Sequence, residues 1–263
     1  MGILIVCKGA DFSKCAVDKV ELPDEPTIPD EPVVPVSIAD YPVQDTLKGL
    51  YDLGGTAEAS VVNHAPTPHI NTKTTELYGM VTVEEDYCAF TGNDNAARVL
   101  TYLRIPLENA VTAVVLFRVA DGIRTILSNR TGGSTALAVG ASLMNNCVVF
   151  STNDAITQRE FPAIGSDNFA ILAMTVAPNG VRVVRYTNGA LNELVNFEGV
   201  VDAWQTGSTG NAIQIGGNGK SNAYQDGDVS LAAIHEGVMT DEQLESICEF
   251  VRKYGKQKGL TVE

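Results

Sequence analysis

The run Val111–Val119 (VTAVVLFRV) constrains the fold most, because almost all of its side chains are apolar. A short apolar run without polar alternation is typical of a strand that is covered on both faces. Phe169–Val176 is a second run of this kind and ends at Pro178-Asn179-Gly180, and Val181–Tyr186 then ends at Asn188-Gly189. An Asn-Gly pair between β-prone runs predicts a hairpin, because both turn residues need a positive φ.

Further short β-prone runs, separated by glycine and proline turns, occupy most of the chain after residue 43. They are Leu47–Leu53, Ala59–Ala65, Leu77–Val83, Tyr87–Phe90, Val99–Ile105, Thr125–Ser128, Ala136–Ala141, Cys147–Ser151, Ile213–Ile215 and Val229–His235. Many short strands with regular turns and a single helix predict an all-β protein, an antiparallel β-sandwich.

The helix is expected near the C-terminus. Thr240 is a suitable N-cap, and Gln243 three residues later completes a capping box. Met239 and Leu244 fit a hydrophobic staple, and Gly255 is a suitable residue for ending the helix. The residues with helical spacing that form its apolar face are Leu244, Ile247, Cys248, Val251 and Tyr254. We expect this face to pack on a sheet or to cap one end of the sandwich.

The first 42 residues have a different character. Residues 1–20 begin with a short apolar run, and an isolated strand of this length is not stable alone. Residues 21–42 hold more than half of the chain's 11 prolines, among acidic residues, and predict a stiff extended spacer. We therefore predict an anchor or oligomerisation strand (1–20), a proline-rich acidic stalk (21–42) and a head (43–263). An edge strand of the sandwich is the alternative for residues 1–20.

The charge balance excludes some partners. There are 18 Lys and Arg against 32 Asp and Glu, which gives a net charge of −14. Such a surface repels nucleic-acid phosphates and anionic lipids. No apolar run approaches the roughly 20 residues of a membrane-spanning helix, and we expect no secretory signal. The five scattered cysteines form no CxxC pair and predict neither a disulfide framework nor a zinc site.

The order of these segments resembles concanavalin A-like and laminin G-like jelly-roll domains. The resemblance covers roughly residues 45–255 and rests on a series of short segments. These are Leu50–Leu53, VVLFRV, Ile126–Arg130, the hairpin Ala177–Gly189, the turn Ile215–Gly219 and the closing GDVSLAAIHEGVMTDEQL. It implies a jelly-roll head, and it allows a Ca²⁺ site near the rim of the sandwich.

The string KGADFSKCAVDKV is similar to a short N-terminal element of virion proteins from phages of gut Bacteroidetes. This resemblance implies that the chain is made in the host cytoplasm and is carried on the virion surface. Residues 1–20 would then contact other virion proteins or form a homo-oligomer, with a trimer favoured. The candidate anchor residues are Ile3, Ile5, Asp11 and Phe12.

Catalytic patterns are missing from the sequence. Jelly-roll glycosidases carry carboxylates two residues apart on one strand, whereas Glu84, Glu85 and Asp86 are contiguous and alternate between faces. Asp226 and Asp228 have the spacing but lack a third acid. We therefore predict a chain that is not an enzyme, and we expect no cofactor beyond a candidate Ca²⁺ ion.

The candidate binding residues lie in polar loops. Asp94 and Asn95, or Asp226 and Asp228, are candidate Ca²⁺ ligands, with ordinary Asx turns as the alternative. Glycans are commonly bound by aromatic rings together with amide or acid groups. Trp204 and Tyr224 are the candidates for that role, with packing at the sandwich rim as the alternative.

Three functions follow from these observations. The first is a non-enzymatic phage virion protein, a head or tail fibre or a decoration protein, whose head binds host-surface polysaccharide. The second is a glycoside-active enzyme of the same fold. The third is a purely structural capsid component.

Overall fold

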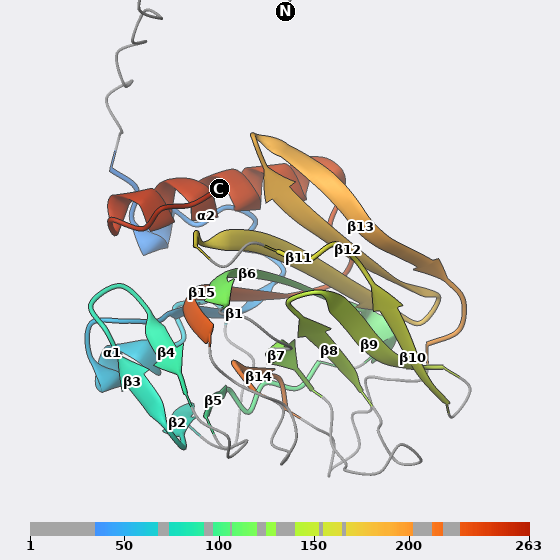
Figure 1. Cartoon of the computed structure of the whole chain (residues 1–263), viewed down its shortest axis with the longest axis horizontal. Helices are drawn as coiled ribbons and strands as arrows, with labels where there is room; N and C mark the ends of the chain where they lie inside the picture. The colour runs from blue at the N-terminus through green and yellow to red at the C-terminus, as the bar shows by residue number, and fades with distance from the viewer. Residues whose placement is uncertain are drawn as a thin grey trace, which may run out of the picture. The chain divides into compact units, whose positions relative to one another are not determined.

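The computed structural model describes residues 35–67, 74–91, 97–105, 107–119, 125–129, 140–152, 155–164, 167–201, 212–217 and 227–263. Within these residues two antiparallel β-sheets pack as a sandwich, and a C-terminal helix lies on one of them (Figure 1). The predicted all-β sandwich with a C-terminal helix is therefore confirmed. Among the helices that the structure describes, none is long and apolar enough to cross a membrane.

The first sheet has eight strands in the described part of the chain, in the order β13-β12-β11-β6-β15-β4-β3, with β1 also paired to β15. Its strands are β1 (Leu47–Asp52), β3 (Val81–Val83), β4 (Cys88–Phe90), β6 (Val111–Val119), β11 (Ala170–Ala177), β12 (Gly180–Thr187), β13 (Ala190–Glu198) and β15 (Gly227–Glu236). The hairpin between β12 and β13 is confirmed, because Asn188 and Gly189 have φ of 54° and 78°.

The second sheet has the order β10-β9-β8-β7-β14-β5-β2. Its strands are β2 (Glu76–Tyr78), β5 (Arg98–Leu100), β7 (Thr125–Ser128), β8 (Ala141–Met144), β9 (Cys147–Thr152), β10 (Ala155–Glu160) and β14 (Gln214–Ile215). Among the described strands, β2 and β10 form the two edges of this sheet.

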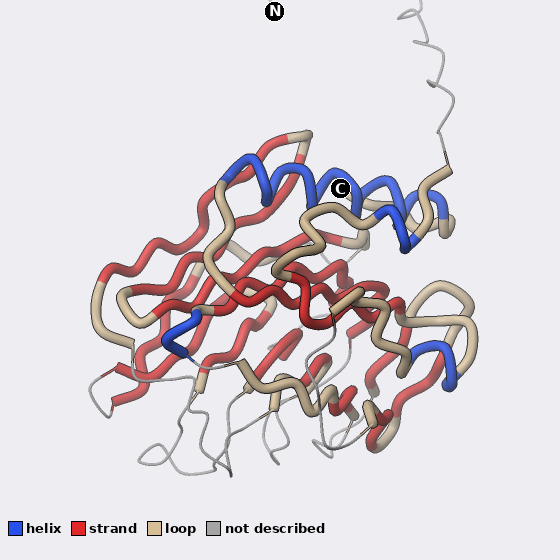
Figure 2. Tube along the Cα trace, turned by 180° about the vertical axis from the view of Figure 1, so that it is seen from behind, coloured by secondary structure: helices blue, strands red, loops and turns tan. Residues whose placement is uncertain are grey.

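Strand β6 has two buried faces, as its apolar sequence predicts. Val115 and Phe117 belong to the core between the two sheets. Val114 and Leu116 belong to a second cluster, between the first sheet and the C-terminal helix. The first sheet is thus a central layer with the second sheet on one side and the helix on the other, as Figure 2 shows from behind.

The helix α2 (Asp241–Gln257) begins as predicted and ends later. The Thr240–Gln243 capping box is formed, and Met239 and Leu244 are both buried in the second cluster. The prediction that Gly255 ends the helix is wrong. A Cβ at Gly255 would lie 2.7 Å from Leu116 Cδ2, so this glycine permits close approach of the helix to the sheet.

Two predicted strands differ from the structure. Leu77–Val83 contains two strands of different sheets, because β2 pairs with β5 whereas β3 pairs with β4. The chain changes sheet at Gly79, which has φ of 78°. Part of Ala59–Ala65 is helical, since α1 (Ala57–Ser60) is capped by the Thr56 side chain.

The last residues of the predicted stalk lie against the head. A short 3-10 turn, Ile38–Asp40, precedes Tyr41, whose ring is buried in the second cluster. A second 3-10 turn, Leu107–Asn109, precedes β6. Residues 1–34 lie outside the described residues, and the division into anchor, stalk and head stays a prediction.

Candidate functional site

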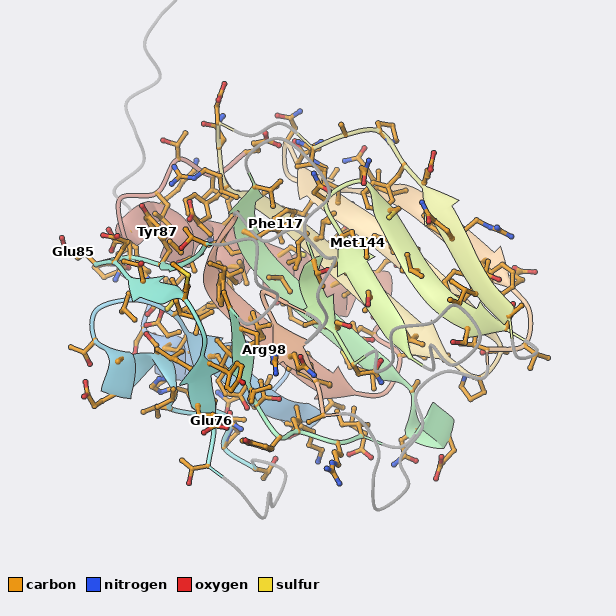
Figure 3. All side chains as sticks on the ribbon, turned by 60° about the horizontal axis from the view of Figure 1, so that its bottom comes forward. Glu76, Glu85, Tyr87, Arg98, Phe117 and Met144 are labelled. Atoms are coloured by element: carbon orange, nitrogen blue, oxygen red, sulfur yellow. The ribbon has the colours of Figure 1, made fainter. Side chains whose placement is uncertain are left out.

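A cluster of aromatic and charged side chains lies at the edge of the second sheet formed by β2 and β5. These strands pair so that Tyr78 faces Arg98 and Glu76 faces Leu100. Leu77 and Val99 point into the core, so the alternate residues on both strands lie on the outer face. Figure 3 shows Glu76 and Arg98 near one another at this edge. We call Glu76, Tyr78, Arg98 and Tyr102 the Tyr78 platform.

Tyr78 gives the platform an accessible aromatic surface. Its exposed fraction is 47%, which is high for a large apolar side chain. The Arg98 guanidinium carbon lies 4.5 Å from the centre of the Tyr78 ring. A cation at this distance is attracted to the ring and restricts its motion. Burial lowers the pKa of Arg98. The exposed Tyr78 ring is thus contacted by the Arg98 guanidinium on one of its faces.

Tyr102 orients the carboxylate of Glu76. The Tyr102 hydroxyl donates a hydrogen bond to Glu76 Oε1, and this bond raises the pKa of Tyr102. The backbone of Tyr102 is left-handed, with φ of 56°. For a residue other than glycine this costs about 1–3 kcal/mol, and such strain gathers at functional sites. The local fold therefore holds Tyr102 beside Glu76 in spite of an unfavourable backbone.

The platform combines the groups that carbohydrate recognition needs. The apolar face of a sugar ring can pack on Tyr78, and the sugar hydroxyls can donate hydrogen bonds to the Glu76 carboxylate. The second Glu76 oxygen has no hydrogen bond to another described residue. The carboxylate can therefore accept a ligand hydroxyl without losing its contact with Tyr102.

Of the predicted Ca²⁺ ligands, the structure describes only Asp228, which lies in β15. Arg118 donates to Asp228 Oδ2 from Nη2 at 2.6 Å and from Nε at 2.9 Å. The Arg118 guanidinium carbon also lies 4.9 Å from the centre of the Phe169 ring. Asp228 on β15 thus forms an ion pair with Arg118 on the neighbouring strand β6. No group of three His, Cys, Asp or Glu in the described ranges could hold a metal ion.

The other predicted site residues lie outside the described residues. They are Asp94, Asn95 and Asp226 for Ca²⁺, Trp204 and Tyr224 for glycan, and Ile3, Ile5, Asp11 and Phe12 for the anchor. Their roles stay predictions.

Sequence reasoning missed the Tyr78 platform. Glu76 and Tyr78 are two residues apart, and so are Arg98 and Leu100, which places each pair on one face of a strand. That spacing was a usable signal. The pairing of β2 with β5 could not be read from it, because their register depends on contacts across the sheet.

The comparisons support the fold. No protein-family model and no curated protein matches this chain. Among solved structures it is similar to Trypanosoma rangeli sialidase in complex with sialic acid, with a TM-score of 0.53 and 12% identity. That match covers 79% of this chain and 33% of the sialidase. The chain is also similar to the receptor binding domain of botulinum neurotoxin D, with a TM-score of 0.50 and 11% identity over 81% of this chain and 53% of the other.

This similarity shows a shared β-sandwich fold. The chain spans about a third of the length of the sialidase and about half of the neurotoxin domain.

Proposed function

We propose that this chain is a non-enzymatic surface protein of a bacteriophage virion, a fibre or decoration protein, whose head binds host-surface glycans. The Tyr78 platform carries the glycan part of this proposal. An exposed aromatic ring that is backed by a cation and flanked by an oriented carboxylate matches the needs of a sugar ring. The N-terminal arm, through residues 1–20, would attach the head to other virion proteins.

A weak contact with one sugar suits a protein that is present in many copies. The platform is open and engages a ligand from one side, so affinity for a single sugar would be low. Copies held together on a particle would bind a polysaccharide with far higher avidity, because later contacts form intramolecularly. A homo-oligomer, with a trimer favoured, would supply this arrangement.

The similar structures share the fold of this chain, and one of them is described in complex with a sugar. One is a sialidase that holds sialic acid, and the other is a domain that binds a receptor. Neither transfers a ligand or an activity to this chain, and the Tyr78 platform remains the basis of the proposal.

A glycoside-active enzyme is the second candidate, and the pairing of Tyr102 with Glu76 is the observation that favours it. Sialidases use a tyrosine nucleophile, and a nearby carboxylate can act as its base. Against this, a tyrosine nucleophile must lose its proton to react, and the contact with Glu76 raises the pKa of Tyr102. Sugar release from sialylated and neutral oligosaccharides, which Tyr102→Phe abolishes, would establish the enzyme and overturn the non-enzymatic proposal.

Glycan binding can be tested with an array of bacterial surface polysaccharides. The head is expected to bind a restricted set of glycans. Tyr78→Ala should weaken binding at least about tenfold, because it removes the stacking surface. Tyr78→Phe, the matched control, should bind like the wild type because it keeps the ring. Equal binding by Tyr78→Ala and the wild type would refute the role of the platform.

The virion location needs a separate experiment. Antibodies against the head should label purified phage particles in immunogold electron microscopy. Deletion of residues 1–20 should release the protein from the particles while the head stays folded. Particles that lack the protein would contradict the virion part of the proposal and leave glycan binding untouched.

A further inference from the structure

A groove of about 250 Å³ lies on the outer face of the first sheet, where β11 and β13 end and β12 begins, beside the connection from β15 to α2. Its polar walls are formed by Asn179, Arg182, Asn196 and Glu198, and Val238 supplies an apolar wall. The Tyr78 platform lies on the second sheet. The groove is therefore a separate surface of the head with its own residues.

A row of polar residues crosses the first sheet and ends in this groove. Its residues lie opposite one another on neighbouring strands of the sheet. From β15 to β13 they are His235, Thr112, Thr175, Arg182 and Asn196. The buried part of the row is satisfied internally, since Thr112 Oγ1 lies 3.1 Å from Thr175 Oγ1 and 2.8 Å from the Gly237 carbonyl oxygen. The other end of the row, the half-buried Arg182 and the exposed Asn196, lines the groove.

Two carboxylates hold Arg182 in place. Its Nη1 lies 2.5 Å from Asp241 Oδ1, and its Nε lies 3.2 Å from Glu193 Oε2. Asp241 is the first residue of α2, so the capped helix fixes its position. The ion pair lowers the pKa of Asp241 and raises that of Arg182, so both stay charged at neutral pH. Arg182 is thus a hydrogen-bond donor whose charge is already neutralised by two carboxylates.

The charge of the groove selects against acidic ligands. Of the nearby carboxylates, Glu198 lines the groove, and Glu193 and Asp241 contact Arg182 beside it, so three negative charges surround one positive charge. A carboxylate or phosphate entering here would meet net repulsion, which is several times stronger near a protein surface than in bulk water.

The remaining lining suits hydroxyl groups and an apolar ring face. Asn179 and Asn196 are exposed, and neither side-chain amide has a hydrogen bond to another described residue. Each amide offers donors and an acceptor. Val238 is 62% exposed and can pack on an apolar surface. The volume is below the roughly 300–1,000 Å³ of pockets for drug-sized ligands, so it suits a single ring.

We propose that this groove is a second carbohydrate subsite, and that it takes one uncharged sugar unit and rejects acidic sugars. The inference rests on the proposed function for its ligand class, while its residues are independent of the Tyr78 platform. Two sites on different sheets would let one head engage two points of a polysaccharide, or two chains of it.

The test uses side-chain amide NMR signals of the full-length protein. Methyl glycosides of glucose, galactose and N-acetylglucosamine are titrated one at a time, and the methyl glycoside of N-acetylneuraminic acid is the acidic probe. At least one neutral glycoside should shift the amide signals of Asn179 and Asn196 saturably, and the acidic probe should leave them in place.

Variants separate the groove from the rest of the head. Asn196→Ala should weaken the neutral glycoside at the Asn179 signal by about tenfold, the loss of roughly one well-formed hydrogen bond. Asn192→Ala, on the same strand but outside the groove lining, is the matched control and should change nothing. Glu198→Gln should raise the affinity for the acidic probe severalfold, and added salt should diminish the difference between Glu198→Gln and the wild type.

Three outcomes would overturn the inference. Tighter binding of the acidic probe than of the neutral glycosides at Asn179 and Asn196 would contradict the charge argument. Neutral glycosides that bind in a Tyr78-dependent manner but leave both amide signals unmoved would refute the groove and leave the proposed function intact. If no glycan binds at the Tyr78 platform or in the groove, both the glycan-binding function and the second subsite are refuted.

Discussion

Acidification from pH 7.5 to pH 5 is expected to destabilise the head by about 2 kcal/mol through His235. This histidine is fully buried where β15 meets the segment that precedes β1. Its Nε2 lies 3.0 Å from the Tyr41 hydroxyl, and its Nδ1 lies 3.0 Å from Thr46 Oγ1. A neutral imidazole has one donor and one acceptor, so the two hydroxyls satisfy it completely.

The sign follows from burial. Burial lowers the pKa of His235 from 6.5 to about 4, so the unfolded chain binds the proton at a higher pH than the folded head does. Stability is therefore complete above pH 6.5 and falls as the pH drops toward 4. The whole shift corresponds to about 3 kcal/mol, and about 2 kcal/mol is lost by pH 5. Cys248, on α2 beside Tyr41, adds no charge because its pKa is raised to about 12.

The assay is urea denaturation at pH 7.5, 6 and 5, with His235→Gln as the comparison. The variant should lose about 1–3 kcal/mol at pH 7.5, because one hydroxyl loses its partner. Its stability should change much less than that of the wild type between pH 6.5 and 4. Equal pH dependence of the two proteins would refute the reasoning, as would an NMR titration that places the pKa of His235 near 6.5.

Three further predictions concern stability. Gly255→Ala should lower the denaturation midpoint in spite of the better helix propensity of alanine, because its Cβ would lie 2.7 Å from Leu116 Cδ2 and overpacking costs about 1–3 kcal/mol; a raised midpoint would contradict the close packing of α2. Asp52→Ala should cost about 1–3 kcal/mol in the same assay, because Asp52 accepts hydrogen bonds from Tyr254 Oη at 2.6 Å and Lys258 Nζ at 2.9 Å; an unchanged midpoint would show that water replaces both. If the predicted Ca²⁺ site exists, millimolar Ca²⁺ should raise the Tm and EDTA should reverse the effect; an unchanged Tm would remove that prediction.

The layered fold was predictable because its signals are local. The apolar run of β6 requires cover on both faces, and the structure places a core on each side of it. The Thr240 capping box and the Asn188-Gly189 turn are set by residues within a few positions of each other. Such features depend on backbone geometry and nearby hydrogen bonds, which sequence patterns report well.

The strand pairing that assembles the Tyr78 platform was not predictable, because it depends on register. Glu76 and Tyr102 come into contact only after β2 pairs with β5. The sequence predicted one long strand at Leu77–Val83, whereas β2 and β3 belong to different sheets. The prediction of the C-terminal end of α2 was wrong for a related reason. Gly255 is conformationally suited to end a helix, but its actual role is to let α2 approach Leu116 on β6. Contacts between distant segments decide both cases.

Saturation-transfer NMR on the full-length protein, with the glycan that binds best on the array, tests the central claim most directly. Protons on one face of a single sugar ring should receive saturation from the aromatic signals of the wild type and of Tyr78→Phe. Tyr78→Ala should lose this transfer while its stability is unchanged, since Tyr78 is an exposed residue. Undiminished transfer in Tyr78→Ala would contradict the proposal that the head binds glycans through the Tyr78 platform.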